Sequence, residues 1–145
     1  GKARGDSHGG RVPVSAGDAA AGRAMKPLVV AFLLCWSVAL QDVVRVIDGD
    51  TLEARLAIWL DLTATETIRL LGVDTPERHG ATKAAGEAAR TFTEAWLAGH
   101  KDVMTVWACR RDSFGRLLGG VSADGTTLTS ALLAAGHGRV YERGK

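Results

Sequence analysis

The chain has 145 residues, which suggests one domain, and its 46% hydrophobic and 23% charged residues are ordinary for a globular protein. The formal net charge is +2, but residues 42–145 carry 13 Lys or Arg against 14 Asp or Glu. This balance excludes a broad basic surface as the basis for binding a polyanion, so any such binding must come from local clusters.

The first forty residues are not expected to belong to the fold. Residues 1–24 are rich in Gly, Ala, Ser and Arg, and we expect them to be disordered or a non-native extension. Residues 25–40 begin with Met and Lys and include the apolar run 28–40, which is short for a membrane span of about 20 residues but suits a signal peptide. A retained membrane anchor and a buried helix are the alternatives. We therefore expect a secreted, periplasmic or cell-envelope protein with its domain at residues 41–145.

The two cysteines are Cys35 and Cys109. Cys35 lies in the segment that is expected to be removed, so we expect Cys109 to be unpaired and predict no disulfide framework. The Cys-x-x-Cys and Cys/His spacings that are typical of zinc sites do not occur in the sequence.

Three strands are predicted in the first half of the domain. Residues 43–47 form an apolar strand that ends at the turn DGD, a strong hairpin signal. Residues 52–58 then alternate between apolar and polar side chains, as a half-buried strand does. The apolar positions of this second strand are Leu52, Ala54, Leu56 and Ile58. Residues 65–73 form the third strand, which ends at Asp74 because a proline follows two positions later.

The second half begins with a helical period over residues 85–96 and continues with two strands and a short helix. One face of the first helix carries Ala85, Ala88, Ala89, Phe92 and Trp96, and Gly99 is expected to cap its C terminus. Strands are predicted at residues 103–109 and 116–123. The last helix has Thr127 or Thr129 as N-cap and Gly136 as its end. This order predicts a mainly β, α+β fold: a five-stranded OB-fold Greek-key barrel with two short helices.

Acidic side chains recur where the predicted strands end. Asp48 and Asp50 follow the first strand, and Asp74 and Glu77 follow the third. If these strand ends lie close together, the carboxylates repel one another unless a cation lies between them, and oxygen ligands favour Ca²⁺ or Mg²⁺. An EF-hand is excluded because Glu53 occupies the position that requires glycine. A simple hairpin turn and a strand exit are the structural alternatives.

Two arginines complement these acids. Arg69 precedes Asp74 by five positions, an odd separation that places them on opposite faces of a regular strand, so a twist or bulge is required. Arg116 follows the turn DSFG, and two guanidinium groups with a divalent ion form a phosphate clamp. With Glu77 as a general base, the set predicts metal-assisted phosphodiester hydrolysis. A surface strand position for Arg69 and an ion pair with a nearby acid for Arg116 are the alternatives.

The motifs "VIDGDT", "IRLLGVDTPE" and "DSFGR", in this order, resemble the staphylococcal nuclease-like (thermonuclease) family over residues 43–141. The resemblance implies an OB-fold nuclease that hydrolyses DNA and RNA with Ca²⁺, and we expect a monomer. It implies that Asp50, Asp74 and the carbonyl oxygen of Thr75 are Ca²⁺ ligands, with Asp48 in the outer shell. It also implies that Arg69 and Arg116 bind the scissile phosphate and that Glu77 orients or deprotonates the attacking water.

Two departures from the family pattern concern substrate binding. Phe114 stands where the family often has Tyr, and Ser113 replaces a frequent Lys. Phe114 and Tyr141 are candidate substrate-binding residues, because aromatic rings stack on bases. A core or rim position is the alternative for Tyr141. The competing function is a non-catalytic OB-fold module that binds nucleic acid or protein.

Overall fold

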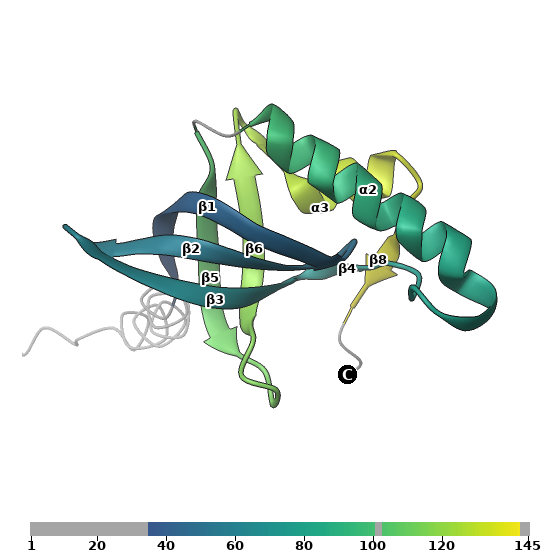
Figure 1. Cartoon of the computed structure of the whole chain (residues 1–145), viewed down its shortest axis with the longest axis horizontal. Coiled ribbons are helices and arrows are strands. Elements are labelled where there is room, and N and C mark those ends of the chain that lie inside the picture. Colours follow the sequence, from purple (N-terminus) through teal and green to yellow (C-terminus); the bar gives the residue numbers. More distant parts are fainter. Residues whose placement is uncertain (1–34, 101–102, 143–145) are drawn as a thin grey trace, which may run out of the picture. The chain divides into compact units, whose positions relative to one another are not determined.

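The computed structural model describes residues 35–100 and 103–142. Within these residues, five strands form a closed barrel (Figure 1). The strands are β1 (Trp36–Asp48), β2 (Thr51–Trp59), β3 (Leu62–Leu70), β5 (Thr105–Arg111) and β6 (Leu117–Ala123). They lie in the order β3-β2-β1-β5-β6, and a parallel pairing between β3 and β6 closes the barrel. The predicted OB-type barrel is confirmed.

Strand β1 is long and irregular, and it pairs with two strands of the barrel, β5 and β2. Its first residues pair antiparallel with β5, from Trp36 opposite Ala108 to Ala39 opposite Thr105. From Leu40 onward it pairs with β2, with register shifts that mark bulges. Bulges of this kind bend a strand, and the bend allows one chain segment to serve two neighbours.

Alternating apolar side chains of the strands fill the barrel. Leu52, Leu56, Ile68, Val106 and Val121 are fully buried. The alternation predicted for β2 is confirmed as far as Leu56 and fails at Ile58, which is 39% exposed. The reason is that β1 pairs with β2 no further than Leu56, so the rest of β2 has only β3 as a neighbour.

The free end of the β2–β3 hairpin forms a two-stranded ribbon beyond the barrel (Figure 1). Its turn exposes Trp59 (72%), Leu60 (85%) and Leu62 (60%). Leu60 has a positive φ of 38°, a conformation that a branched side chain rarely adopts. The ribbon therefore contributes little to the hydrophobic core.

Two helices lie on the barrel. Helix α2 (Lys83–Gly99), which follows the 3₁₀ turn η1 (Gly80–Thr82), has 17 residues. It buries Gly86, Ala89, Thr93 and Leu97, whereas Ala85 and Ala88 of the predicted face are exposed. The predicted buried face was therefore wrong by about one residue. Gly86 and Thr93 lie at the contact, and neither has an apolar side chain that the helical pattern would count. Gly99 is the last helical residue, and His100 is the C-cap rather than Gly99.

The C-terminal segment confirms the predicted helix boundaries. Helix α3 (Leu128–Ala134) follows the short strand β7 (Thr126–Thr127). Thr127 is its N-cap, with a capping box to Ser130, and Gly136 has a φ of +74° directly after the helix. Strand β8 (Arg139–Tyr141) then pairs antiparallel with β4 (Gly72–Asp74), apart from the barrel sheet.

A disulfide joins Cys35 to Cys109 across 74 residues. The expectation that Cys109 is unpaired is wrong, because it assumed that Cys35 is lost with the leader. The residues Trp36–Leu40, placed in the leader by the sequence, form the start of β1. The predictions for residues 1–24 and for the rest of the leader, through residue 34, lie outside the described residues. No helix among the described residues is long and apolar enough to cross a membrane.

Candidate active site

The turn between β1 and β2 places Asp50 in the interior, with its side chain only 8% exposed. Gly49 permits this because a Cβ atom there would lie 2.7 Å from the Cβ of Ala89 and 2.9 Å from Cγ2 of Thr75. The hydroxyl of Thr93 on α2 donates a hydrogen bond of 2.6 Å to the carbonyl oxygen of Gly49. The helix therefore holds the DGD turn in place from one side.

Asp50 is linked to the second motif through the backbone. Its Oδ2 atom accepts a hydrogen bond of 2.8 Å from the amide of Thr75, and its Oδ1 atom accepts one of 2.9 Å from the hydroxyl of Thr51. The carbonyl oxygen of Asp50 accepts a bond of 2.9 Å from the amide of Leu70 at the end of β3. The first and third strand ends thus meet, as the clustering hypothesis required.

Arg69 lies between the two carboxylates. Its Nη2 atom is 3.3 Å from Oδ2 of Asp50 and 3.4 Å from Oδ1 of Asp74. Its Nη1 atom donates to the carbonyl oxygens of Leu70 (2.8 Å) and Val73 (2.9 Å). These contacts fix the guanidinium group, whose side chain is 15% exposed.

The break in the third predicted strand explains how Arg69 reaches Asp74. Residues 65–73 do not form one strand, because the chain turns at Gly72, where φ is +82°. A residue without a Cβ adopts this conformation at little cost. The break places β4 after β3, and the odd separation of five residues no longer puts the two side chains on opposite faces. The expected irregularity is therefore present.

Arg116 reaches the same region through the parallel pairing of β3 and β6, in which Ile68 lies opposite Leu117. Asp112 fixes the position of Arg116. Its Oδ2 atom accepts a hydrogen bond of 2.8 Å from Nε of Arg116. Its Oδ1 atom accepts hydrogen bonds from the backbone amides of Arg116 (3.0 Å) and Phe114 (2.9 Å). Burial alone would raise the pKa of Asp112, but these hydrogen bonds and the charge of Arg116 keep that pKa below its ordinary value. Asp112 therefore remains ionised as the partner of Arg116.

A hollow of about 220 Å³ brings both arginines together with both candidate aromatic residues. Phe114 is 82% exposed, and its ring lies 5.3 Å from the guanidinium carbon of Arg116. Tyr141 on β8 is 48% exposed. The lining residues are Arg69, Leu71, Asp112, Ser113, Phe114, Arg116, Leu118 and Tyr141.

Two predicted site residues make no hydrogen bond or ion pair with the side chains of this cluster among the described residues, although Glu77 lines a hollow together with Asp74 and Thr75. Glu77 is 72% exposed, and its Oε2 atom lies 2.6 Å from Nε2 of His79. Asp48 makes no hydrogen bond or ion pair with the cluster in the part of the chain that the structure describes. The structure therefore joins Asp50, Asp74, Thr75, Arg69 and Arg116, and leaves the side chain of Glu77 directed to solvent.

The donor set at Asp50 and Asp74 fits a hard divalent cation. Both carboxylates approach one Arg69 atom, and the buried hydroxyl oxygen of Thr75 has no hydrogen-bond partner among the described residues. An all-oxygen set of this kind suits Ca²⁺, whose coordination is commonly completed by water. No three His, Cys, Asp or Glu side chains gather as a complete metal site within residues 35–100 and 103–142. Protein carboxylates would therefore supply only part of the ligand shell.

Sequence reasoning missed Arg139. Strand β8 places it opposite Asp74, and both Nε (3.0 Å) and Nη2 (2.8 Å) donate to Oδ2 of Asp74. Gly138 allows the close approach, because a Cβ there would lie 2.5 Å from Cγ2 of Val73. A glycine followed by an arginine near the end of the chain gave no local signal for this long-range contact.

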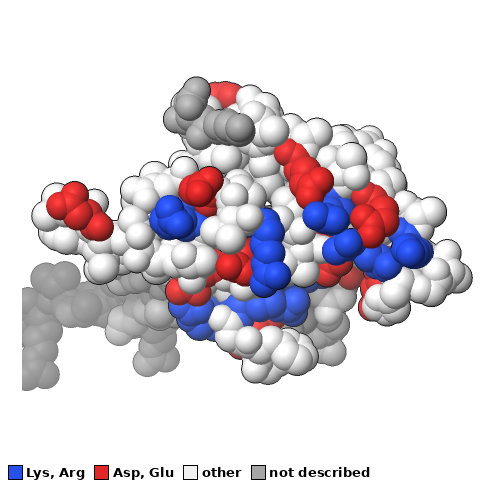
Figure 2. All heavy atoms as spheres, viewed as in Figure 1, with Lys and Arg blue, Asp and Glu red and all other residues white. Residues whose placement is uncertain are grey.

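The distribution of surface charge supports electrostatic effects that are local to the candidate site rather than a broad basic surface. Figure 2 shows positive and negative side chains interleaved on the face seen there. Several charged side chains of the described residues form ion pairs, such as Arg90 with Glu94 (2.9 Å) and Arg45 with Glu53 (2.9 Å). The charge of the site therefore comes from its own arginines and carboxylates.

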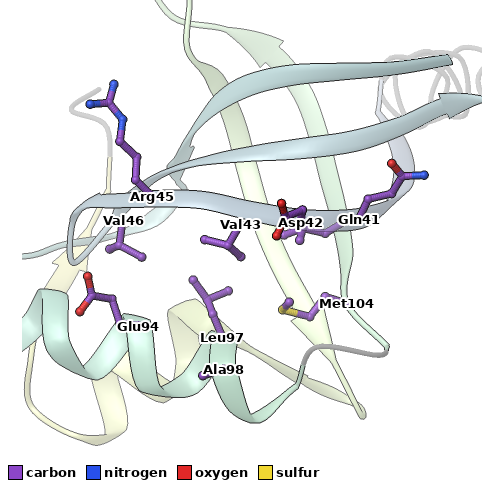
Figure 3. Close-up of a pocket in the computed structure, with 10 residues that line it drawn as sticks. Gln41, Asp42, Val43, Arg45, Val46, Glu94, Leu97, Ala98 and Met104 are labelled. Carbon is purple, nitrogen blue, oxygen red and sulfur yellow. The ribbon is translucent and has the colours of Figure 1, made fainter.

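A separate hollow of about 480 Å³ lies between β1 and α2 (Figure 3). Val43, Val46, Leu97 and Met104 line it with apolar atoms. None of the predicted site residues lines this hollow. It is therefore not the candidate active site.

Comparisons with known proteins identify the family of this chain. A sequence model described as staphylococcal nuclease homologue matches residues 67–145. Proteins named "Uncharacterized endonuclease" from Escherichia coli O157:H7 and from Escherichia coli are each 35% identical over 122 residues, which cover 81% of this chain and 72% of the relative. The matched range includes Arg69, Asp74, Glu77 and Arg116.

Proposed function

Because this chain belongs to the staphylococcal nuclease homologue family, we propose that it is a Ca²⁺-dependent endonuclease that hydrolyses phosphodiester bonds of DNA and RNA. The observation that carries the proposal is the position of Arg69 between Asp50 and Asp74, in a hollow shared with Arg116. Two fixed guanidinium groups beside two carboxylates suit a phosphodiester that is attacked in the presence of a cation.

In the proposed mechanism, Asp50, Asp74 and the carbonyl oxygen of Thr75 hold Ca²⁺, and Asp48 contributes negative charge from further away. Bound Ca²⁺ supplies charge stabilisation for the phosphate oxygens. Arg69 and Arg116 bind the scissile phosphate, and their existing hydrogen bonds orient them before substrate arrives. Such preorganised donors stabilise the charge that develops in the transition state.

Glu77 is proposed to orient the attacking water or to accept its proton. The water oxygen forms a new bond to phosphorus and gives up a proton to Glu77 or to solvent, the P–O bond to the leaving nucleotide breaks, and the leaving oxygen takes up a proton from solvent. The exposed Glu77 carboxylate must exchange its contact with His79 for this water. Both side chains are more than two-thirds exposed, so this rotation displaces no packed group.

The proposal extends to the compartment in which the protein acts. Disulfides persist in oxidising environments, so the Cys35–Cys109 bond supports a secreted, periplasmic or cell-envelope protein. Cleavage at the expected end of the leader, after residue 40, would remove Cys35 and the β1 residues that pair with β5. We therefore propose that any cleavage occurs before Cys35. Mass spectrometry of the exported protein tests this, and a mature chain that begins after residue 35 would contradict it.

The decisive experiment is digestion of labelled single-stranded DNA and RNA with Ca²⁺, with Mg²⁺ or with a chelator. We expect cleavage with Ca²⁺, none with the chelator, and a loss of about 10²–10⁴-fold in rate for Glu77→Gln. Glu94→Gln is the matched control, because Glu94 is an exposed glutamate on α2 that pairs with Arg90. A folded protein that binds the nucleic acids and leaves them intact would support the non-catalytic OB-fold module instead.

A further inference from the structure

A second hollow lies beside the one lined by Arg69 and Arg116, and Asp74, Thr75 and Glu77 of the candidate active site are among the residues that line it. It has a volume of about 660 Å³ and shares no lining residue with the hollow of Arg69 and Arg116. The two hollows meet where Asp74, which lines one, contacts Arg69, which lines the other. The lining residues are Asp74, Thr75, Pro76, Glu77, Thr82, Gly136, His137, Gly138 and Arg139.

Among residues 35–100 and 103–142, Arg139 is the one arginine or lysine that lines this second hollow. Its side chain is 82% exposed, yet two of its nitrogen atoms donate to the same oxygen, Oδ2, of Asp74. The other oxygen of Asp74 faces Arg69. Asp74 therefore has one partly buried cationic partner, Arg69, which further hydrogen bonds fix, and one exposed cationic partner, Arg139, which makes no other hydrogen bond or ion pair through its side chain among the described residues.

An exposed ion pair of this kind contributes little to stability, so the guanidinium group can exchange its partner at low cost. A cation that binds Asp74 takes over the neutralisation of the carboxylate and repels Arg139. The displaced side chain remains at the hollow, where a phosphate of a polynucleotide is the matching anion. Phosphates of one strand are regularly spaced, so a chain that enters the first hollow continues past this point.

We propose that Arg139 is an exchangeable partner of Asp74, which neutralises this carboxylate in the cation-free protein and binds a flanking phosphate of the substrate strand once a cation has bound. The second hollow then holds the strand on the other side of the scissile phosphate. His137 supports its wall, since its ring packs against Phe92 with centroids 4.9 Å apart. This inference rests on the proposed function.

The proposal predicts opposite effects of Arg139→Ala on two equilibria. Titration calorimetry of the full chain with CaCl₂ alone is expected to show Ca²⁺ affinity about fivefold or more above wild type, because the competing cation is gone. In the presence of Ca²⁺ and in a Glu77→Gln background that blocks cleavage, fluorescence anisotropy is expected to show weaker binding of a single-stranded oligonucleotide. The slope of log affinity against log salt should fall by about 0.7, as for one lost phosphate contact.

Arg45→Ala is the matched control, because it removes an exposed arginine that pairs with Glu53 outside both hollows. A mononucleotide serves as the second control ligand: it has no flanking phosphate for Arg139 to bind, so with its phosphate at Arg69 and Arg116 it should bind Arg139→Ala as it binds wild type. The inference is overturned if Arg139→Ala matches Arg45→Ala in Ca²⁺ affinity, or if its oligonucleotide affinity and salt slope are unchanged. If wild type itself neither binds Ca²⁺ nor cleaves nucleic acid, the proposed function fails as well, so the two failures are distinguishable.

Discussion

The carboxylate of Asp50 accepts a hydrogen bond of 2.8 Å from the backbone amide of Thr75. This contact joins the hairpin turn of the first motif to the strand exit of the second, across 25 residues of sequence. It is buried, and it orients the Asp50 side chain toward Arg69 and Asp74. Replacing Asp50 is therefore expected to disturb both the cation ligands and the loop that carries Thr75.

Asp50→Asn should reduce Ca²⁺-dependent cleavage by about 10²-fold or more, because a direct ligand loses its charge. Asp48→Asn should reduce it by no more than about tenfold, because Asp48 acts from the outer shell. Initial rates under saturating Ca²⁺ measure both effects. Equal losses in the two variants would contradict the assignment of Asp50 as the direct ligand.

Asp50→Asn also tests folding, because it removes the charge of one of the two carboxylates beside Arg69 and replaces one buried hydrogen-bond acceptor by a donor. The free energy of unfolding should fall by about 1–3 kcal/mol, as for a buried hydrogen-bond partner that is lost. Urea unfolding separates this loss from the loss of rate. If Asp50→Asn is combined with substitutions elsewhere that stabilise the fold, we expect the protein to regain its stability but not its cleavage activity.

Gly49→Ala should destabilise the protein by about 1–3 kcal/mol, because the new Cβ would lie 2.7 Å from the Cβ of Ala89 and force the turn away from α2. Gly99→Ala is the control, since no atom lies within 4 Å of its added Cβ and alanine favours a helix. It should leave stability unchanged or raise it by up to about 1 kcal/mol. Chemical denaturation measures both, and equal effects would contradict the close contact.

Loss of the disulfide should lower stability by about 2–5 kcal/mol, since the bond closes a long loop in the unfolded chain. The double variant Cys35→Ser and Cys109→Ser removes it, and reductant should bring wild type to the same free energy of unfolding. Reductant should not change the double variant. A wild type that is insensitive to reductant would show that the bond does not form.

Glu66 and Arg111 form an ion pair with two short bonds, of 2.6 and 2.7 Å, on the outside of the barrel. The hydrogen bonds from Arg111 lower the pKa of Glu66 from its ordinary value of 4.5. Because the folded pKa is depressed, the stabilisation is fully present above about pH 4.5 and is lost as the pH falls through the lowered value.

Glu66→Gln should therefore be less stable than wild type at pH 7, by about 1 kcal/mol or less for a pair at the surface. The difference should shrink toward zero as the pH falls through the lowered pKa of Glu66 and the wild-type carboxylate becomes protonated. Urea unfolding at pH 7, 5 and 3 measures it. A difference that stays constant or grows at low pH would contradict the pairing.

Local patterns determined much of this protein. Neighbouring residues were enough to predict the DGD turn, the N-cap of α3 at Thr127 and its end at Gly136, because turns and helix ends depend on chain segments a few residues long. The order of the three motifs can also be read directly from the sequence. The alternation of Leu52, Ala54 and Leu56 likewise indicated which side of β2 faces the core. The five-stranded barrel was predictable from these elements in sequence order.

Tertiary structure alone decided the relations between distant segments. The amide of Thr75 meets the carboxylate of Asp50, the pairing of β4 with β8 places Arg139 on Asp74, and the start of β1 brings Cys35 to Cys109. The buried face of α2 includes Gly86 and Thr93, which a hydrophobic pattern does not mark, because their role depends on the residues that they contact. Such contacts carry no local signal because their energy depends on which surfaces meet, and the barrel determines that only when it closes.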